Sequence, residues 1–300
     1  MDIALLQTVM TALGNLGFSW LVGILFARIC LQRDQSDWSC RAQIRLGVAN
    51  TIVLMLCIVC NLGLQWCEAA TLGDTPFSEA GPALVLLLQS THYGHVGLTG
   101  LTALLGLTGA HLILKTNSGV LLVNVLLLLV VALSKVAVSH ASEAGLFSGA
   151  AAIELVHLLL IWFWTGSVCV SGWHVLPGAA NPNPAVSNYL KSLSFYATLA
   201  LGGIVATGLL NAAHILWQSS NLVGQPYTTL VLIKIGLVLL AAALGGFNRF
   251  ASLPDLTEEV TPLARRSILL HRVVLVLKIE SLVLITTLFI AAVLASTAPP

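Results

Sequence analysis

Residues Lys135–Gly166 read KVAVSHASEAGLFSGAAAIELVHLLLIWFWTG, in which two apolar runs are separated by a short polar turn. His140 and Glu143 lie in this turn, which contains no Lys or Arg. Glu154 and His157 follow one to two helical turns inside the second run. Because a helix of about 20 apolar residues crosses a bilayer, the stretch predicts two membrane helices joined at one surface. We expect the four polar groups to converge there, where they could bind a metal or a proton.

The composition of the whole chain agrees with this reading. Hydrophobic residues make up 57% of the 300 and charged residues 8%, and the mean hydropathy is +0.95. A soluble domain carries about 25% charged residues, so we predict a polytopic membrane protein in the lipid bilayer. Helices are expected because the backbone in lipid must satisfy its own hydrogen bonds, and a β-barrel would show alternating polarity. The net charge of +1, without a long basic run, gives no indication of nucleic-acid binding.

The sequence contains eight apolar runs, which predict an all-α bundle of eight transmembrane helices within a single domain, residues 1–300. The runs are 8–29, 46–66, 92–114, 120–140, 150–173, 193–217, 228–247 and 273–295. A shorter apolar segment, Pro82–Ser90, is a candidate interfacial helix that leads into the third run.

The Lys and Arg residues outside the runs orient the bundle. They occur only in alternate connections, the first, third, fifth and seventh: Arg28, Arg33, Arg41, Arg45, Lys115, Lys191, Arg249, Arg265 and Arg266, with Arg272 just after. An excess of Lys and Arg marks the cytoplasmic side. We therefore predict that both termini are outside, and that the turn with His140 faces outward.

Most of the histidines fall in the outer part of the bundle under this orientation. His92 and His95 are three residues apart, as are Glu154 and His157, and His214 follows Asn211 at the same spacing. Residues three apart share a helix face, and imidazole binds copper, zinc, iron and nickel. Polar side chains inside a membrane are costly and are candidates for function. The alternative is that each histidine reaches the interface or bonds a neighbouring helix.

Other polar groups within the runs are candidates for a path or a structural role. Lys234 and Glu280 belong to the last two helices, where a buried ion pair between them would serve structure or a cation or proton path. Cys57 and Cys60 share one face of the second helix and are candidate soft ligands for Cu(I), although inert packing is the simpler interpretation. The sequence has no ATP-binding loop, nucleophile elbow or HExxH motif, which favours a transporter or metal-handling protein over an enzyme.

The second half contains a series of short motifs, namely Tyr227, Lys234, Asn248-Arg249, Arg265-Arg266 and Glu280. Together they resemble the CopD family of bacterial inner-membrane copper-resistance proteins, within a CopD-like part of about 190–296. Ser139-His140-Ala141, His157 with Trp164 and Gly166, and Thr91–Gly94 are similar to further motifs of the family. The resemblance implies copper handling at the inner membrane, commonly copper uptake, with a periplasmic copper-binding partner of the CopC type.

Together these observations lead to a copper hypothesis with a haem alternative. In the first, His140 and His157 bind copper and relay it from the periplasmic side, His92 and His95 complete the site, and His214 is a further candidate. Glu143 or Glu154 would orient an imidazole, and Lys234 and Glu280 would be structural or would gate the path. In the second, b-type haem lies between facing histidines, His92 or His95 opposite His140 or His157. A third interpretation is an accessory subunit without a cofactor, and the sequence leaves open whether the chain forms a homo-oligomer.

Overall fold

The computed structural model describes residues 2–114, 117–179, 183–218, 226–257 and 262–297, with the side chains of 214–218, 226 and 257 excepted. Within these ranges the chain is helical and contains no strand. Eight helices are long and apolar enough to cross a membrane, which confirms the predicted all-α membrane bundle. They are α1 (Ile3–Leu31), α2 (Asp37–Leu72), α4 (His92–Ile113), α5 (Ser118–Ala137), α6 (Gly149–Val170), α7 (Pro184–Gln218), α8 (Pro226–Phe247) and α10 (Leu263–Ala295).

Short helical pieces link or extend these spans. The shorter apolar segment forms α3 (Gly81–Ser90), after the single turn η1 (Phe77–Glu79). The turn η2 (His140–Ser142) joins α5 to α6, η3 (Ser171–Val175) and η4 (Leu176–Gly178) extend α6, and η5 (Asn248–Ser252) and α9 (Leu253–Thr257) extend α8. Both η3 and η5 are π-helical turns, which occur frequently at functional sites.

Polar side chains fix the starts of most long helices. The first amide N–H groups of a helix have no partner within it, so an oxygen just before the first turn stabilises that end. Six helices are capped in this way, by Asp2, Ser36, Thr91, Asn117, Ser148 and Asn183. These caps place the helix starts by local sequence, independently of the surrounding lipid.

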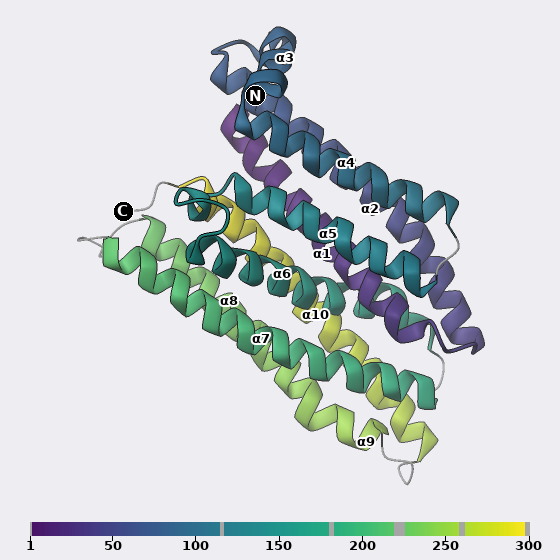
Figure 1. The fold of residues 1–300 in the computed structure, drawn as a ribbon. Coiled ribbons are helices and arrows are strands. Elements are labelled where there is room, and N and C mark those ends of the chain that lie inside the picture. The colour runs from purple at the N-terminus through teal and green to yellow at the C-terminus, as the bar shows by residue number, and fades with distance from the viewer. Residues whose placement is uncertain (1, 115–116, 180–182, 219–225, 258–261, 298–300) are drawn as a thin grey trace.

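The centre of the bundle is formed by α1 and α6. These two helices pack along each other, and both contribute to the two clusters of buried apolar side chains. The backbones of Gly23 and Gly166 lie so close together that a side chain at either position would overlap the other helix. Figure 1 shows α6 between α2 and α4 on one side and α7 and α8 on the other.

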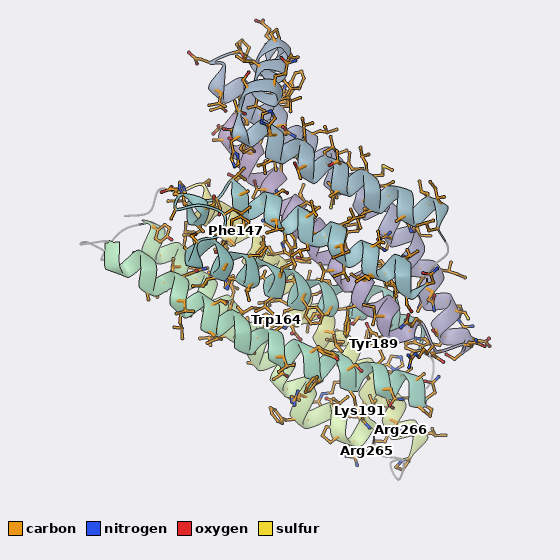
Figure 2. The ribbon with its side chains drawn as sticks, viewed as in Figure 1. Phe147, Trp164, Tyr189, Lys191, Arg265 and Arg266 are labelled. Carbon is orange, nitrogen blue, oxygen red and sulfur yellow. The ribbon has the colours of Figure 1, made fainter. Side chains whose placement is uncertain are left out.

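The two ends of the bundle differ in charge. Lys191, Arg265 and Arg266 lie together at one end, and Phe147, between η2 and α6, lies at the other (Figure 2). The start of α1 and the end of α10 lie at the end opposite α9 (Figure 1). This distribution agrees with the predicted orientation, in which the cation-rich end is cytoplasmic.

A cavity lies between two helix pairs, α6 with α7 and α8 with α10. α7 packs against α6, whereas α8 packs almost entirely against α10. The helices α7 and α8 make hardly any direct contact with each other, and α8 is the least buried of the eight spans. The gap between the two pairs positions the polar groups described next.

Candidate functional site

The outer turn carries an exposed ion pair. The Nδ1 atom of His140 lies 2.7 Å from Oε1 of Glu143, and the two side chains are 89% and 74% exposed. Because a carboxylate can only accept, Nδ1 donates the proton and Nε2 is left as a free base when the ring is neutral. An exposed imidazole held in this tautomer by a carboxylate is a geometry common among metal ligands.

His157 is held in the matching tautomer inside the bundle. The Nδ1 atom lies 2.8 Å from the hydroxyl of Thr207 on α7. That hydroxyl has one hydrogen, which it donates at 2.6 Å to the carbonyl of Gly203. Thr207 must therefore accept from His157, so Nδ1 carries the proton and Nε2 keeps its lone pair. Nε2 makes no hydrogen bond to any residue in the described ranges.

Glu154 and Lys234 extend this arrangement across three helices. Oε2 of Glu154 accepts a hydrogen bond of 2.8 Å from the side-chain amide of Asn211, one turn beyond Thr207 on α7. Lys234 of α8 lies close enough to interact electrostatically with both Glu154 and His157. We name these five residues, Glu154, His157, Thr207, Asn211 and Lys234, the Glu154 network.

The remaining predicted ligands are placed apart from this network. Nε2 of His92 lies 3.2 Å from the carbonyl oxygen of Ala137, and His95 is exposed on the next turn of α4. His214 belongs to α7, but its side chain is outside the described residues. Over the parts of the chain that the structure describes, no three His, Cys, Asp or Glu side chains form a metal-binding group. The structure thus does not gather the four predicted ligands, His92, His95, His140 and His157, into one centre. None of their described hydrogen bonds joins two of these histidines.

Cys57 and Cys60 are buried next to a lysine. Both thiols are free, and Lys135 of α5 interacts electrostatically with both. The ammonium of Lys135 also lies 5.5 Å from the ring centre of Phe18. The pair therefore shares one helix face, as the spacing predicted, but no third ligand accompanies it in the described residues.

The ion pair expected between Lys234 and Glu280 is absent from the described structure, whose two ion pairs lie elsewhere. Lys234 instead faces Glu154, because α8 turns that side toward α6. Glu280 is 2% exposed and lies next to Gly245, 11 residues after Lys234 on α8, where a Cβ would lie 3.2 Å from its carboxylate. The depth of each charge along its helix could be predicted from the sequence, but the neighbour that it faces could not.

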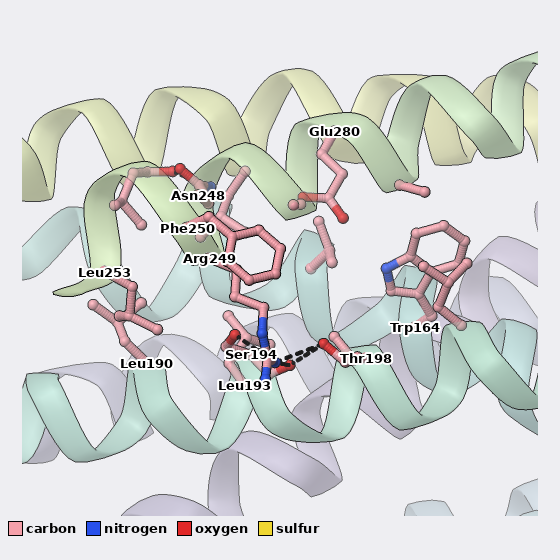
Figure 3. Close-up of a pocket in the computed structure, with 18 residues that line it drawn as sticks. Trp164, Leu190, Leu193, Ser194, Thr198, Asn248, Arg249, Phe250, Leu253 and Glu280 are labelled. Atoms are coloured by element: carbon pink, nitrogen blue, oxygen red, sulfur yellow. Dashed lines mark hydrogen bonds between the residues drawn. The ribbon is translucent and has the colours of Figure 1, made fainter.

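Glu280 lines a cavity of about 260 Å³ between the two helix pairs. Its lining comes from α6, α7, α8, η5, α9 and α10 and is mostly apolar. Figure 3 shows Glu280 and the indole of Trp164 at one end of this space and Leu190 and Leu253 at the other. Arg249 crosses it from η5 and donates to the carbonyl of Ser194 at 3.0 Å and to the hydroxyl of Thr198 at 2.8 Å.

Sequence reasoning did not identify Thr207, Asn248 or the Arg249 contacts as parts of a site. Thr207 and Asn211 are four residues apart in an otherwise apolar run, and this spacing is a signal that both face the same neighbour. Asn248 and Arg249 are consecutive, and the π-helical turn η5 allows both to reach the cavity. That turn has no clear signature in the sequence.

The fold and these buried polar groups define a polytopic helical membrane protein with ionisable side chains between its spans. Residues 187–294 match the CopD family, described as copper resistance protein D, which confirms the resemblance seen in the sequence. This segment spans α7 to α10 and includes Thr207, Asn211, Lys234 and Glu280, whereas His140 and His157 precede it. No curated protein and no solved structure matched the chain.

Proposed function

We propose that the protein binds copper and relays or transports it from the periplasmic side of the bacterial inner membrane toward the cytoplasm. The proposal is supported by the family match over residues 187–294, since the matched family is one of copper resistance. Copper is the cargo here, and the chain must offer it ligands in the membrane.

The observation that carries the proposal is the 2.8 Å contact between Nδ1 of His157 and the hydroxyl of Thr207. The Nδ1–H of this ring is held by Thr207, so the free Nε2 is available to a metal at neutral pH. A metal-bound histidine almost always donates its other ring N–H to an oxygen, which fixes the ring orientation. The half-buried carboxylate of Glu154, one turn away on α6, adds a negative charge that favours a cation. The Glu154 network is thus prepared to receive copper inside the bilayer.

His140 and Glu143 would receive copper first. They lie at the end of the bundle that we predict to face the periplasm, and both are exposed. Phe147, in the same loop, is fully exposed and adds an apolar contact next to the ion pair. Such a surface suits docking of a periplasmic copper-binding protein of the CopC type, which would deliver the metal to His140.

The test is the copper stoichiometry of purified protein. We expect the double variant His140→Ala, His157→Ala to lose copper binding, because both free imidazole nitrogens are removed. The matched control is His271→Ala on α10, whose exposed ring bonds the carbonyl of Ser267 in its own helix. Unchanged copper content in the double variant, with a normal gel-filtration profile, would reject the proposal.

A transport measurement then separates relay from static binding. Wild-type protein in liposomes should move copper into the lumen, and the His157→Ala variant should not. His140→Ala alone should slow uptake at low copper more than at high copper, because its ring acts at the entrance. Uptake by the His157→Ala variant at the wild-type rate would exclude the network from the path.

A further inference from the structure

Two buried hydrogen-bond acceptors line the cavity, the carboxylate of Glu280 and the side-chain oxygen of Asn248, and no described cation pairs with either. The carboxylate of Glu280 is buried, faces the Trp164 indole and has no cation within ion-pair distance in the described residues. The side-chain oxygen of Asn248 is also buried and has no hydrogen-bond partner. Buried polar groups are normally paired, so the unpaired oxygen of Asn248, in the same cavity as a Glu280 carboxylate whose one described donor is the Trp164 indole, indicates a missing donor.

The described hydrogen bonds that Arg249 and Asn248 donate go to other groups. Arg249 directs its Nη1 atom to Ser194 and Thr198 on α7, and its guanidinium lies 6.0 Å from the ring of Phe250. The amide nitrogen of Asn248 faces the carbonyl of Val273 at 3.4 Å. The oxygen of Asn248 and the Glu280 oxygen that does not accept from Trp164 are therefore available to a molecule that enters the cavity.

The size and lining of the cavity decide what kind of molecule fits. A bare metal ion needs several donors, and the described residues around Glu280 offer no group of three His, Cys, Asp or Glu side chains. A space of about 260 Å³ with mostly apolar walls instead accommodates a small ring, and Trp164 and Phe250 supply aromatic surfaces. Ligand pockets of this kind combine apolar walls with a few polar groups that fix orientation.

The position of the cavity between two membrane spans indicates access from the bilayer. It lies between α7 and α8, which scarcely touch, and α8 is the least buried span. Phe250 is 78% exposed and Thr198 is also exposed, and both line the cavity (Figure 3). A ligand that enters by this route must dissolve in lipid.

We propose that this cavity binds the dihydroxy ring of a lipid-soluble quinol. The two ring hydroxyls donate to Glu280 and Asn248, and the apolar tail leaves between α7 and α8. The oxidised quinone has carbonyl oxygens in place of the hydroxyls and offers no donors. The site should therefore prefer the reduced form, and this inference does not depend on copper binding.

The experiment measures the binding of decylubiquinol and decylubiquinone to the purified full chain in lipid nanodiscs. For the wild type we expect the quinol to bind about tenfold more tightly than the quinone, since the quinone leaves a buried acceptor unpaired. In Glu280→Gln this preference should fall to about twofold or less. Glu68→Gln is the matched control, a carboxylate on α2 outside the cavity, and should keep the wild-type preference.

A second variant tests the cavity without altering its acceptors. Gly246 lines the space, and a Cβ there meets no atom within 4 Å, so Gly246→Leu is expected to fold and to fill part of the cavity. It should weaken binding of both forms about equally. Equal affinity of the wild type for both forms would overturn the proposal. So would a preference that survives Glu280→Gln, or a tightly bound phospholipid that quinol does not displace.

Discussion

Two carboxylates in apolar spans, Glu154 on α6 and Glu280 on α10, have opposite surroundings. Glu154 has the amide of Asn211, the cation of Lys234 and the imidazole of His157 around it. Glu280 is more deeply buried, yet it faces only the Trp164 indole and an apolar cavity. A charge inside a membrane is costly, so the difference is that the protein supplies a cation beside Glu154 and supplies none beside Glu280 in the described residues.

The largest expected effect is on stability at Glu154. Glu154→Leu should lower the free energy of unfolding by about 2–3 kcal/mol, because it leaves Lys234 uncompensated and the Asn211 amide unpaired. Reversible unfolding in mixed detergent micelles would measure this change. The double variant Glu154→Leu, Lys234→Met should regain most of the loss. If the double variant is less stable than the single one, the two side chains do not compensate each other.

The next effect concerns the metal. Thr207→Val removes the hydroxyl that holds Nδ1–H of His157, so copper affinity should fall about 10–100-fold, as for other partners of metal-binding histidines. Equilibrium competition with a copper chelator would measure this loss. Thr207→Ser keeps the hydroxyl and should remain within about threefold of the wild type. A full loss in Thr207→Ser would point to packing instead of the hydrogen bond.

At Glu280 the expected stability effect is smaller and of opposite sign. Glu280→Leu removes a buried carboxylate that no described cation compensates, so the unfolding free energy should stay equal or rise by about 1 kcal/mol. The same micelle unfolding experiment gives a direct comparison with Glu154→Leu. A marked destabilisation would mean that Glu280 serves the fold, and the contrast between the two carboxylates would disappear.

The smallest expected effect is at the outer turn. His140→Asn removes an exposed ion pair with Glu143, and such pairs contribute little to stability. We expect no measurable change in thermal unfolding, whereas copper content should fall. A clear loss of stability would show that the pair anchors the turn η2, which would weaken its assignment to copper capture.

Much of the fold follows from the sequence because hydropathy determines which segments enter lipid. The eight apolar runs correspond to the eight long helices, but three of these begin well before the runs do, α2 at Asp37, α7 at Pro184 and α10 at Leu263. Polar residues such as Arg41 and Arg45 continue the helix outside the apolar segment. A capping oxygen, such as that of Ser36, marks the true start of α2 better than hydropathy does.

The candidate site was harder to predict because helical spacing gives a face and a depth, but not a neighbour. The shared face of Glu154 and His157 could be read from their spacing, and that pair forms the core of the network. The partner of Lys234 depended on how α8 is rotated, and this is set by its packing on α10. The cavity depended on the separation of α7 from α8, which leaves no pattern in either helix alone.

The backbone contact between Gly23 and Gly166 has a consequence for any working cycle of this protein. Two helices that meet without side chains between them have little freedom to slide, so α1 and α6 form a fixed frame. α7 packs on α6, and α10 packs on both α1 and α6, whereas α8 is held almost entirely through α10. An alternation between outward and inward openings would thus be carried by α8, and a larger residue at Gly23 would push α1 away from α6.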